Sequence, residues 1–246
     1  MKIIGIIPAR YASTRFPGKP LVDIAGKSMI QRVYEQVKGC ASLAEVIVAT
    51  DDARIEEHVK SFAGNVLMTS DKHQSGTDRC AEVMNKIAGF DIAINIQGDE
   101  PFINPLQIEL LCALFEAENT QIGTLVKRID NTEDLFKEST PKVVLNTAME
   151  AIYFSRHTIP FQQHVAHEKW LENQTYFKHI GIYGYRKDVL AQIPSLPVSA
   201  LEKAEGLEQL RWIENGYAIK VAETTHDTIA VDHPSDVQNI LDSFFK

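Results

Sequence analysis

The stretch KIIGIIPARYASTRFPGKP, residues 2–20, decides the fold class, because a short apolar run leads directly into a basic loop. The isoleucine-rich run at residues 2–8 predicts a buried strand. The loop contributes Arg10, Arg15 and Lys19, and the first 22 residues contain no acidic residue. Ligands of open α/β sheets bind beyond the carboxyl ends of the strands, so these cations are expected to converge on phosphate. A solvated basic loop without a ligand is the alternative.

Outward from this stretch, short β-branched runs alternate with helical patterns, which is typical of a mostly parallel sheet covered by helices. The expected strands are residues 2–8, 45–50, 66–69, 91–97 and 122–126, and the expected helices are residues 27–38, 53–62, 80–87 and 105–117. After residue 126 polar turns separate strands at 142–146, 151–154 and 179–185, which predicts antiparallel additions. A helix at 201–215, a strand at 218–222, a strand end at 229–231 and a helix at 235–244 complete the chain. We therefore expect one α/β domain, residues 1–246, with an antiparallel insertion around 142–186.

Composition excludes several classes of protein. The chain has 246 residues, 44% of them hydrophobic and 24% charged, which is ordinary for a globular domain. Its net charge is −8, so a general nucleic-acid binder is not expected. Cys40, Cys80 and Cys112 match neither zinc-ligand spacing nor a disulfide framework, and no apolar run is long enough for a membrane span. These features predict a cytoplasmic protein that binds no membrane.

The turn NIQGDEP, residues 95–101, follows a predicted central strand and presents acids toward the edge where the basic loop lies. A second acid, Asp232, follows another predicted strand end. Two carboxylates from distant segments suit Mg²⁺, which takes one or two protein carboxylates together with substrate phosphates and waters. Asp99 and Asp232 are the predicted pair, and the assignment of Glu100 is weaker. An ordinary acidic turn is the alternative interpretation.

The order of motifs along the chain resembles a known family. The motifs are IIPARYASTRFPGKPL, VATDD, HQSGTDR, NIQGDEP, YFSR, HIGIYGYR, LEQLR and VDHPSDV, and they span almost the whole chain. They are similar to those of the 3-deoxy-manno-octulosonate (Kdo) cytidylyltransferases. The resemblance implies a Rossmann-like nucleotidyltransferase fold, usually homodimeric, that uses Mg²⁺. It also implies that CTP and Kdo give CMP-Kdo and pyrophosphate for lipopolysaccharide biosynthesis.

The resemblance also implies residue roles. Catalysis is expected from Lys19, Asp99 and Asp232, with both aspartates as metal ligands. Nucleotide contacts are expected from Ala9, Arg10, Arg15, Lys19, Ser75, Gly76, Arg79 and Gln97. Sugar contacts are expected from Gln97, Arg156, His179, Tyr183, Glu208 and Gln209. Each group has a purely structural alternative: Ser75 as a helix cap, His179 and Tyr183 as core or interface residues, and Glu208 paired with Arg211 at helical spacing.

The expected reaction is in-line displacement at the α-phosphorus of CTP by the anomeric hydroxyl of the sugar acid, with positioning and charge neutralisation as the main catalytic needs. Two alternatives remain open: a cytidylyltransferase for an amino-substituted Kdo or a sialic acid, and a nucleotide-binding module without catalysis. The stretch at residues 162–176 is polar and aromatic without periodicity. We expect it to pack against a second subunit in a homodimer.

Overall fold

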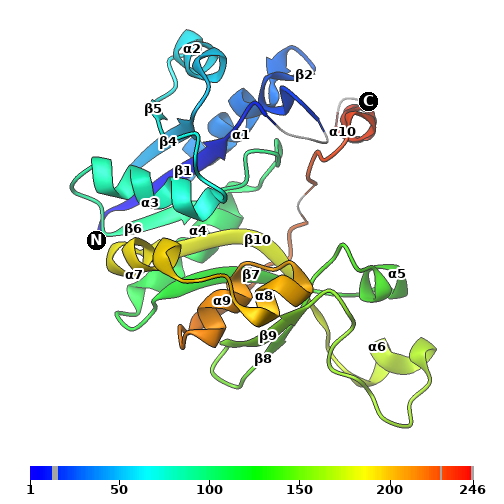
Figure 1. The fold of residues 1–246 in the computed structure, drawn as a ribbon. Helices are drawn as coiled ribbons and strands as arrows, with labels where there is room; N and C mark the ends of the chain where they lie inside the picture. The colour runs from blue at the N-terminus through cyan, green and yellow to red at the C-terminus, as the bar shows by residue number, and fades with distance from the viewer. Residues whose placement is uncertain (13–15, 228, 245–246) are drawn as a thin grey trace.

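The computed structural model describes residues 1–12, 16–227 and 229–244, and within these ranges a nine-stranded sheet forms the centre of the molecule (Figure 1). The strand order is β11-β7-β10-β6-β1-β4-β5, and β8 pairs with both β10 and β9 beside this path. The strands are β1 (Ile3–Ala9), β4 (Glu45–Thr50), β5 (Val66–Met68), β6 (Ile92–Asn95), β7 (Ile122–Arg128), β8 (Lys142–Leu145), β9 (Ala151–Ser155), β10 (Phe177–Arg186) and β11 (Ile219–Glu223). A separate ribbon joins β2 (Asp23–Ile24) to β3 (Lys27–Ser28).

The prediction of a mostly parallel sheet with antiparallel additions is confirmed, with one refinement. Strand β1 runs parallel to β4 and β6, and the pairs β4/β5 and β7/β11 are also parallel. Strand β10 is antiparallel to β6 and β7, so it lies inside the sheet rather than at its edge. This insertion places Tyr183 of β10 directly opposite Asn95 of β6.

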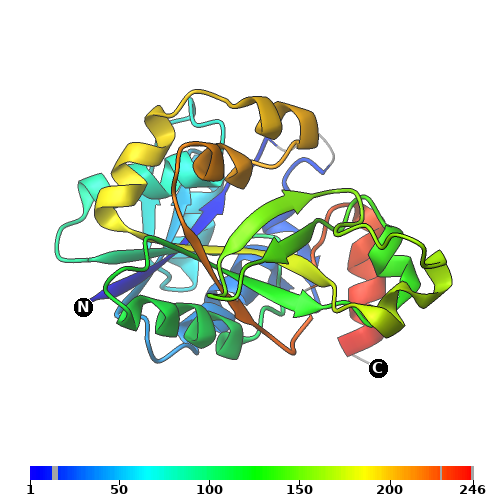
Figure 2. The same cartoon turned by 90° about the horizontal axis from the view of Figure 1, so that it is seen from below.

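Two layers of helices cover the sheet (Figure 2). One face packs against α1 (Met29–Lys38), α2 (Ala53–Ser61) and α4 (Pro105–Ala113), and the other against α3 (Gly76–Lys86), α7 (Lys187–Gln192) and α9 (Gln209–Glu214). The side chains of β1 point to both faces of the sheet: Ile3 and Ile7 pack in the core under the first group of helices, and Ile4 and Ile6 pack in the core under the second. None of the described helices is long and apolar enough to cross a bilayer.

A small lobe at one end of the molecule contains β8, β9, α5 (Thr132–Phe136) and α6 (Trp170–Asn173) (Figure 1). Its core is aromatic: the rings of Trp170 and Tyr176 are stacked with centroids 6.1 Å apart, and both pack with Ile129 and Leu135. The stretch at residues 162–176, which lacks periodicity in the sequence, is therefore folded on itself around Trp170.

Three element predictions are wrong in detail. The helix expected at 201–215 is two helices, α8 (Ala200–Glu205) and α9, because Gly206 adopts a left-handed conformation that ends α8. The helix expected from residue 80 begins at Gly76, because the Ser75 hydroxyl and the Asp78 carboxylate form a capping box. The strand end expected at residues 229–231 is an irregular segment.

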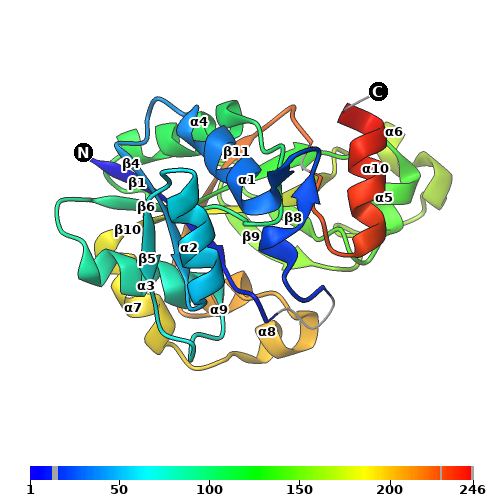
Figure 3. The same cartoon turned by 90° about the horizontal axis from the view of Figure 1, so that it is seen from above.

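The last helix, α10 (Pro234–Phe244), returns to the N-terminal part of the chain (Figure 3). Together with Val231, its Ile240 packs against Ile24 of β2 and Met29 of α1 in a separate apolar cluster. The backbone amide of Val231 donates to the carbonyl of Asp99 at 2.9 Å. This docking brings the residue after Val231, Asp232, to the end of the sheet where the basic loop lies.

Candidate active site

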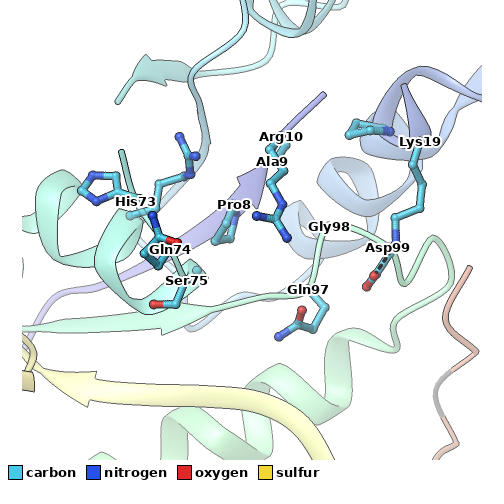
Figure 4. Close-up of a pocket in the computed structure, with 13 residues that line it drawn as sticks. Pro8, Ala9, Arg10, Lys19, His73, Gln74, Ser75, Gln97, Gly98 and Asp99 are labelled. Atoms are coloured by element: carbon cyan, nitrogen blue, oxygen red, sulfur yellow. Dashed lines mark hydrogen bonds and ion pairs between the residues drawn. The ribbon is translucent and has the colours of Figure 1, made fainter. Parts of the chain in front are cut away.

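The main cleft lies beyond the carboxyl ends of β1 and β6, between the basic loop and the N-terminus of α3 (Figure 4). Its volume is about 320 Å³. It is lined by Pro8, Ala9, Arg10, Lys19, Pro20, His73, Gln74, Ser75, Gly76, Arg79, Gln97, Gly98 and Asp99. Every nucleotide-contact residue expected from the sequence lines this cleft except Arg15, which lies outside the described residues.

The floor of the cleft depends on a close approach between two strand ends. A Cβ atom at Gly98 would lie 2.7 Å from the carbonyl oxygen of Pro8, closer than such atoms pack. Glycine at this position therefore lets the turn that carries Asp99 lie against the end of β1. In the view of Figure 4, the side chain of Arg10 is drawn between those of Ser75 and Asp99.

A lysine and two aspartates form a charged group at the cleft: Lys19 and Asp99 line it, whereas Asp232 lies beside them and lines neither cavity. The Lys19 ammonium donates to a carboxylate oxygen of Asp99 at 2.7 Å and to the carbonyl of Val231 at 2.9 Å. It also lies 3.9 Å from a carboxylate oxygen of Asp232. Asp99 and Asp232, 133 positions apart in the sequence, thus both lie within 4 Å of the Lys19 ammonium. Their sharing of a magnesium ion stays a prediction.

The oxygen atoms around the Lys19 ammonium are of the kind that binds a hard divalent cation. Among the described residues, no group of three or more His, Cys, Asp or Glu side chains forms a complete metal cage. The Lys19 ammonium instead occupies a position bounded by two carboxylates and the Val231 carbonyl, all oxygen ligands. Magnesium takes few protein carboxylates and completes its shell with phosphate oxygens and water, so a two-carboxylate site beside a phosphate cleft suits it.

The opposite wall of the cleft is the start of α3. The Ser75 hydroxyl accepts from the backbone amide of Asp78, so its capping role is confirmed, while Ser75 and Gly76 also line the cleft. Arg79 is 4% exposed, and its guanidinium donates to the Thr69 hydroxyl and lies 3.1 Å from Asp51. Arg79 thus borders the cleft with its charge already paired.

A second, smaller cavity of about 140 Å³ adjoins the main cleft. It is lined by Pro8, Gly76, Thr77, Asn95, Gln97, Gly98, Tyr183, Glu208, Gln209 and Trp212. Gln97 borders both cavities and donates to the carbonyl of Gly181 at 2.8 Å. The sequence-based placement of Gln97 between nucleotide and sugar therefore matches its position between two compartments.

The second cavity is rich in polar groups that are removed from water. Tyr183 is 8% exposed and Trp212 1%, and neither the Tyr183 hydroxyl nor the Trp212 indole nitrogen has a hydrogen-bond partner among the described residues. Burial raises the pKa of the Glu208 carboxyl, which accepts from the Thr77 hydroxyl at 3.2 Å. Buried polar groups without protein partners are uncommon, and such groups around a cavity favour a polar ligand.

The alternative pairing of Glu208 with Arg211 is wrong. The Arg211 guanidinium instead makes two bonds to Glu202, at 2.7 and 2.6 Å, across the break between α8 and α9. Glu208 is consequently left facing the second cavity together with Gln209.

Two of the expected sugar-contact residues do not line either cavity. Arg156 lies at the end of β9, where its guanidinium donates to the backbone carbonyls of Glu205 and Gly206. His179 lies four residues before Tyr183 on β10, with its ring bonded to the Thr124 hydroxyl at 3.0 Å and its ring centroid 5.2 Å from that of Tyr183. Enclosure by protein lowers the His179 pKa to about 3, so this ring is neutral at ordinary pH.

Sequence reasoning missed several residues that line the cavities. Thr77, Asn95 and Trp212 border the second cavity and His73 the first. His73 and Thr77 lie inside the motif HQSGTDR, Asn95 is the first residue of NIQGDEP, and Trp212 directly follows LEQLR, so the motifs could have indicated all four. The sequence also assigned no role to His226, whose ring contacts the Asn104 amide at 3.2 Å and helps hold the segment that leads to Asp232.

Comparisons with known proteins agree with this geometry. A family model described as Cytidylyltransferase matches residues 4–223. A 3-deoxy-manno-octulosonate cytidylyltransferase from Parabacteroides distasonis is 58% identical and covers 98% of this chain and 97% of its own. The enzyme of the same name from Bacteroides thetaiotaomicron is 56% identical, with 97% and 96% coverage. The structure of a CMP:2-keto-3-deoxy-manno-octonic acid synthetase complexed with CTP is 46% identical, with a TM-score of 0.90 over 98% of this chain and 97% of that one.

Proposed function

The chain belongs to the 3-deoxy-manno-octulosonate cytidylyltransferase family, and we propose that it joins CTP to Kdo, giving CMP-Kdo and pyrophosphate for lipopolysaccharide synthesis. The observation that carries this proposal is the pair of adjoining cavities that share Gln97. The larger has cations and a helix N-terminus for a nucleotide, and the smaller has hydroxyl, amide and carboxylate groups for a sugar. Transfer between two substrates needs both compartments to meet at the reacting atoms.

The nucleotide occupies the larger cleft in this proposal. Arg10 and Lys19 neutralise the triphosphate and the charge that develops on the pyrophosphate leaving group, together with Arg15 of the same loop. Gly76 is the first residue of α3 and lines the cleft, where a helix N-terminus favours an anion or a polar base edge.

Asp99 and Asp232 are the residues that would hold Mg²⁺. When bound there, the ion supplies charge neutralisation at the α-phosphate and a lower pKa for the attacking sugar hydroxyl. Lys19 balances the negative charge of the two carboxylates, from which its ammonium is 2.7 and 3.9 Å distant. The geometry supports this assignment because Lys19 and Asp99 line the cleft with Gln97, and Asp232 lies 3.9 Å from the Lys19 ammonium.

The acceptor sugar occupies the smaller cavity. The Tyr183 hydroxyl and the Gln209 amide are placed to bond sugar hydroxyls, and Glu208 can accept from a hydroxyl when ionised or donate when protonated. His179 supports this wall from behind Tyr183. Arg156 contacts the sugar acid only if the small lobe moves, because its guanidinium is bonded to α8 carbonyls.

Assembly as a homodimer is part of the proposal. Three large apolar side chains on the small lobe are exposed: Phe136 at 41%, Ile152 at 52% and Phe161 at 72%. An apolar surface of this kind on one lobe favours contact with another protein surface.

Location in the cytoplasm is also part of the proposal. The three buried cysteines are free thiols, which fits the reducing environment of the cytoplasm.

The deciding experiment measures pyrophosphate release with each nucleoside triphosphate crossed against Kdo, 8-amino-substituted Kdo and N-acetylneuraminic acid. We expect release with CTP and Kdo that depends on Mg²⁺. Preference for a sialic acid or an amino sugar would overturn the assignment of the acceptor, and binding of CTP without release with any acid would overturn the assignment of catalysis.

A further inference from the structure

Tyr11 and Gly18 hold the two ends of the basic loop together, and we call this pair of residues the loop neck. The backbone amide of Gly18 donates to the Tyr11 carbonyl at 3.0 Å, joining the described residues on either side of the loop. The Tyr11 ring also lies against Gly18, where an added Cβ would be 3.2 Å from ring atoms of Tyr11. Arg10 and Lys19 directly flank this neck, so its geometry sets the direction in which both cations leave the backbone.

Arg54 of α2 stacks on the Tyr11 ring. Its guanidinium carbon lies 3.3 Å from the ring centroid, within the range of a strong cation–π contact. The guanidinium is held in place by Asp52, which accepts from Nε at 2.9 Å and from a terminal nitrogen at 2.6 Å. Asp52 is itself fixed, because it caps the N-terminus of α2.

Neither Arg54 nor Tyr11 lines the cleft, and the Arg54 charge is already neutralised by Asp52. A direct contact with phosphate is therefore not their role. The preceding residue, Asp51, pairs with Arg79 on the opposite wall of the cleft. Two adjacent aspartates after β4 thus contact both sides of the cleft. Asp51 binds Arg79 on the α3 side, and Asp52 holds Arg54 against Tyr11 on the side of the basic loop.

We propose that the Asp52–Arg54–Tyr11 stack is a positioning device for the triphosphate loop, which holds the loop neck in its binding geometry before the nucleotide arrives. This inference rests on the proposed function. A loop ordered in advance loses less conformational freedom on binding, so its cations bind phosphate more tightly. The stack acts on the β- and γ-phosphates through the loop, and it leaves recognition of the cytidine and of the sugar to other residues.

The test compares binding of CTP, CMP and inorganic tripolyphosphate by calorimetry without sugar acid. The variants are Arg54→Ala, Arg54→Lys, Tyr11→Leu and Tyr11→Phe, with Lys60→Ala as a control that removes another exposed cation from α2. We expect Arg54→Ala and Tyr11→Leu to weaken CTP and tripolyphosphate binding about 5- to 10-fold, the range of a cation–π contact. CMP binding should change less than about 2-fold, as for surface substitutions in general.

Tyr11→Phe keeps the ring and should bind all three ligands like the wild type, as should Lys60→Ala. Arg54→Lys keeps the charge but loses the planar stack, so it should lie between wild type and Arg54→Ala. The proposal would be overturned if CMP binding and CTP binding were weakened equally, or if both Arg54→Ala and Tyr11→Leu bound tripolyphosphate as tightly as the wild type. Tripolyphosphate reports on the loop even if the proposed sugar or base is wrong, so the two failures are distinguishable.

Discussion

The ammonium group of Lys19 lies 2.7 Å from a carboxylate oxygen of Asp99, so a lysine and an aspartate that are 80 positions apart form the charged centre of the cleft. Lys19 comes from a short 3₁₀ turn after the basic loop, and Asp99 from the turn after β6. The side chains are 15% and 26% exposed, so water screens the pair only in part. This contact couples the basic loop directly to the residues proposed to hold the metal.

Replacing Asp99 or Asp232 with Asn should reduce turnover by about 10²–10³-fold or more, because each change removes charge from a shared coordination shell. The double variant should lose little beyond either single variant, as expected for members of one functional unit. Rates of pyrophosphate release across a Mg²⁺ titration check this, with exposed Asp188→Asn on α7 as the control. Multiplicative losses would show that the two carboxylates act independently.

Lys19→Ala should raise the KM for CTP and lower kcat while the fold is retained. The change removes a cation from the cleft, together with its contacts to the carboxylates of Asp99 and Asp232. Steady-state kinetics, with circular dichroism to monitor folding, measure both effects. Arg15→Ala should also raise the KM for CTP. Normal kinetics in both variants would show that the basic loop does not bind the phosphates of CTP.

Glu208→Gln should stabilise the protein at neutral pH while weakening sugar binding. Burial raises the Glu208 pKa, so the folded state holds its proton to a higher pH than the unfolded state. Stability from this group is present below the unfolded pKa, near 4.5, and is lost as pH rises through the folded value. The gain in melting temperature on substitution should therefore be largest near pH 7–8 and shrink toward pH 4.5.

Exposed Glu57→Gln is the matched control for Glu208→Gln and should leave the melting temperature unchanged at every pH. A rise in the KM for the sugar acid without a change in the KM for CTP is expected in parallel. A variant that is less stable than wild type at pH 8 would contradict the buried-carboxylate argument.

His179→Gln should make stability less sensitive to acid. The folded pKa of His179 is lowered to about 3 by burial, so unfolding below the ordinary histidine pKa of about 6.5 takes up a proton. The wild type should therefore lose this part of its stability between about pH 6.5 and pH 3. Denaturant unfolding at pH 7 and pH 5 measures the difference, and equal losses in both proteins would mean that His179 is not the group responsible.

Phe161→Asp should convert a dimer into a monomer. Phe161 is 72% exposed on the small lobe, and a buried charge at a subunit contact is costly. Light scattering at micromolar concentration gives the mass of each form, and Val198→Asp, at a 50% exposed apolar position elsewhere, serves as the control. A monomeric wild type would refute assembly through this lobe.

Much of the site was predictable because local sequence dictates it. The isoleucine-rich run before the basic loop specifies a buried strand, and a loop after such a strand lies at the ligand-binding edge. The NIQGDEP turn likewise follows a predicted strand, which places Asp99 at the same edge. Arg10, Lys19 and Asp99 could be assigned to one site for these reasons, whereas Gln97 was expected from the resemblance to a known family. The close approach between Gly98 and Pro8 came only from the structure.

By itself, the sequence determined the α/β class, the order of most strands and helices along the chain, and the position of the basic loop at the ligand-binding edge, because alternation and loop composition are local properties. Most other residues of the cleft were expected only from the resemblance to a known family. Tertiary structure alone decided that β10 lies inside the sheet, which places Tyr183 opposite Asn95 and creates the second cavity. It also decided that Arg211 pairs with Glu202 and that Arg54 stacks on Tyr11. Such contacts join segments far apart in the chain or depend on where a helix ends, and no local pattern encodes which of the possible partners packs with which.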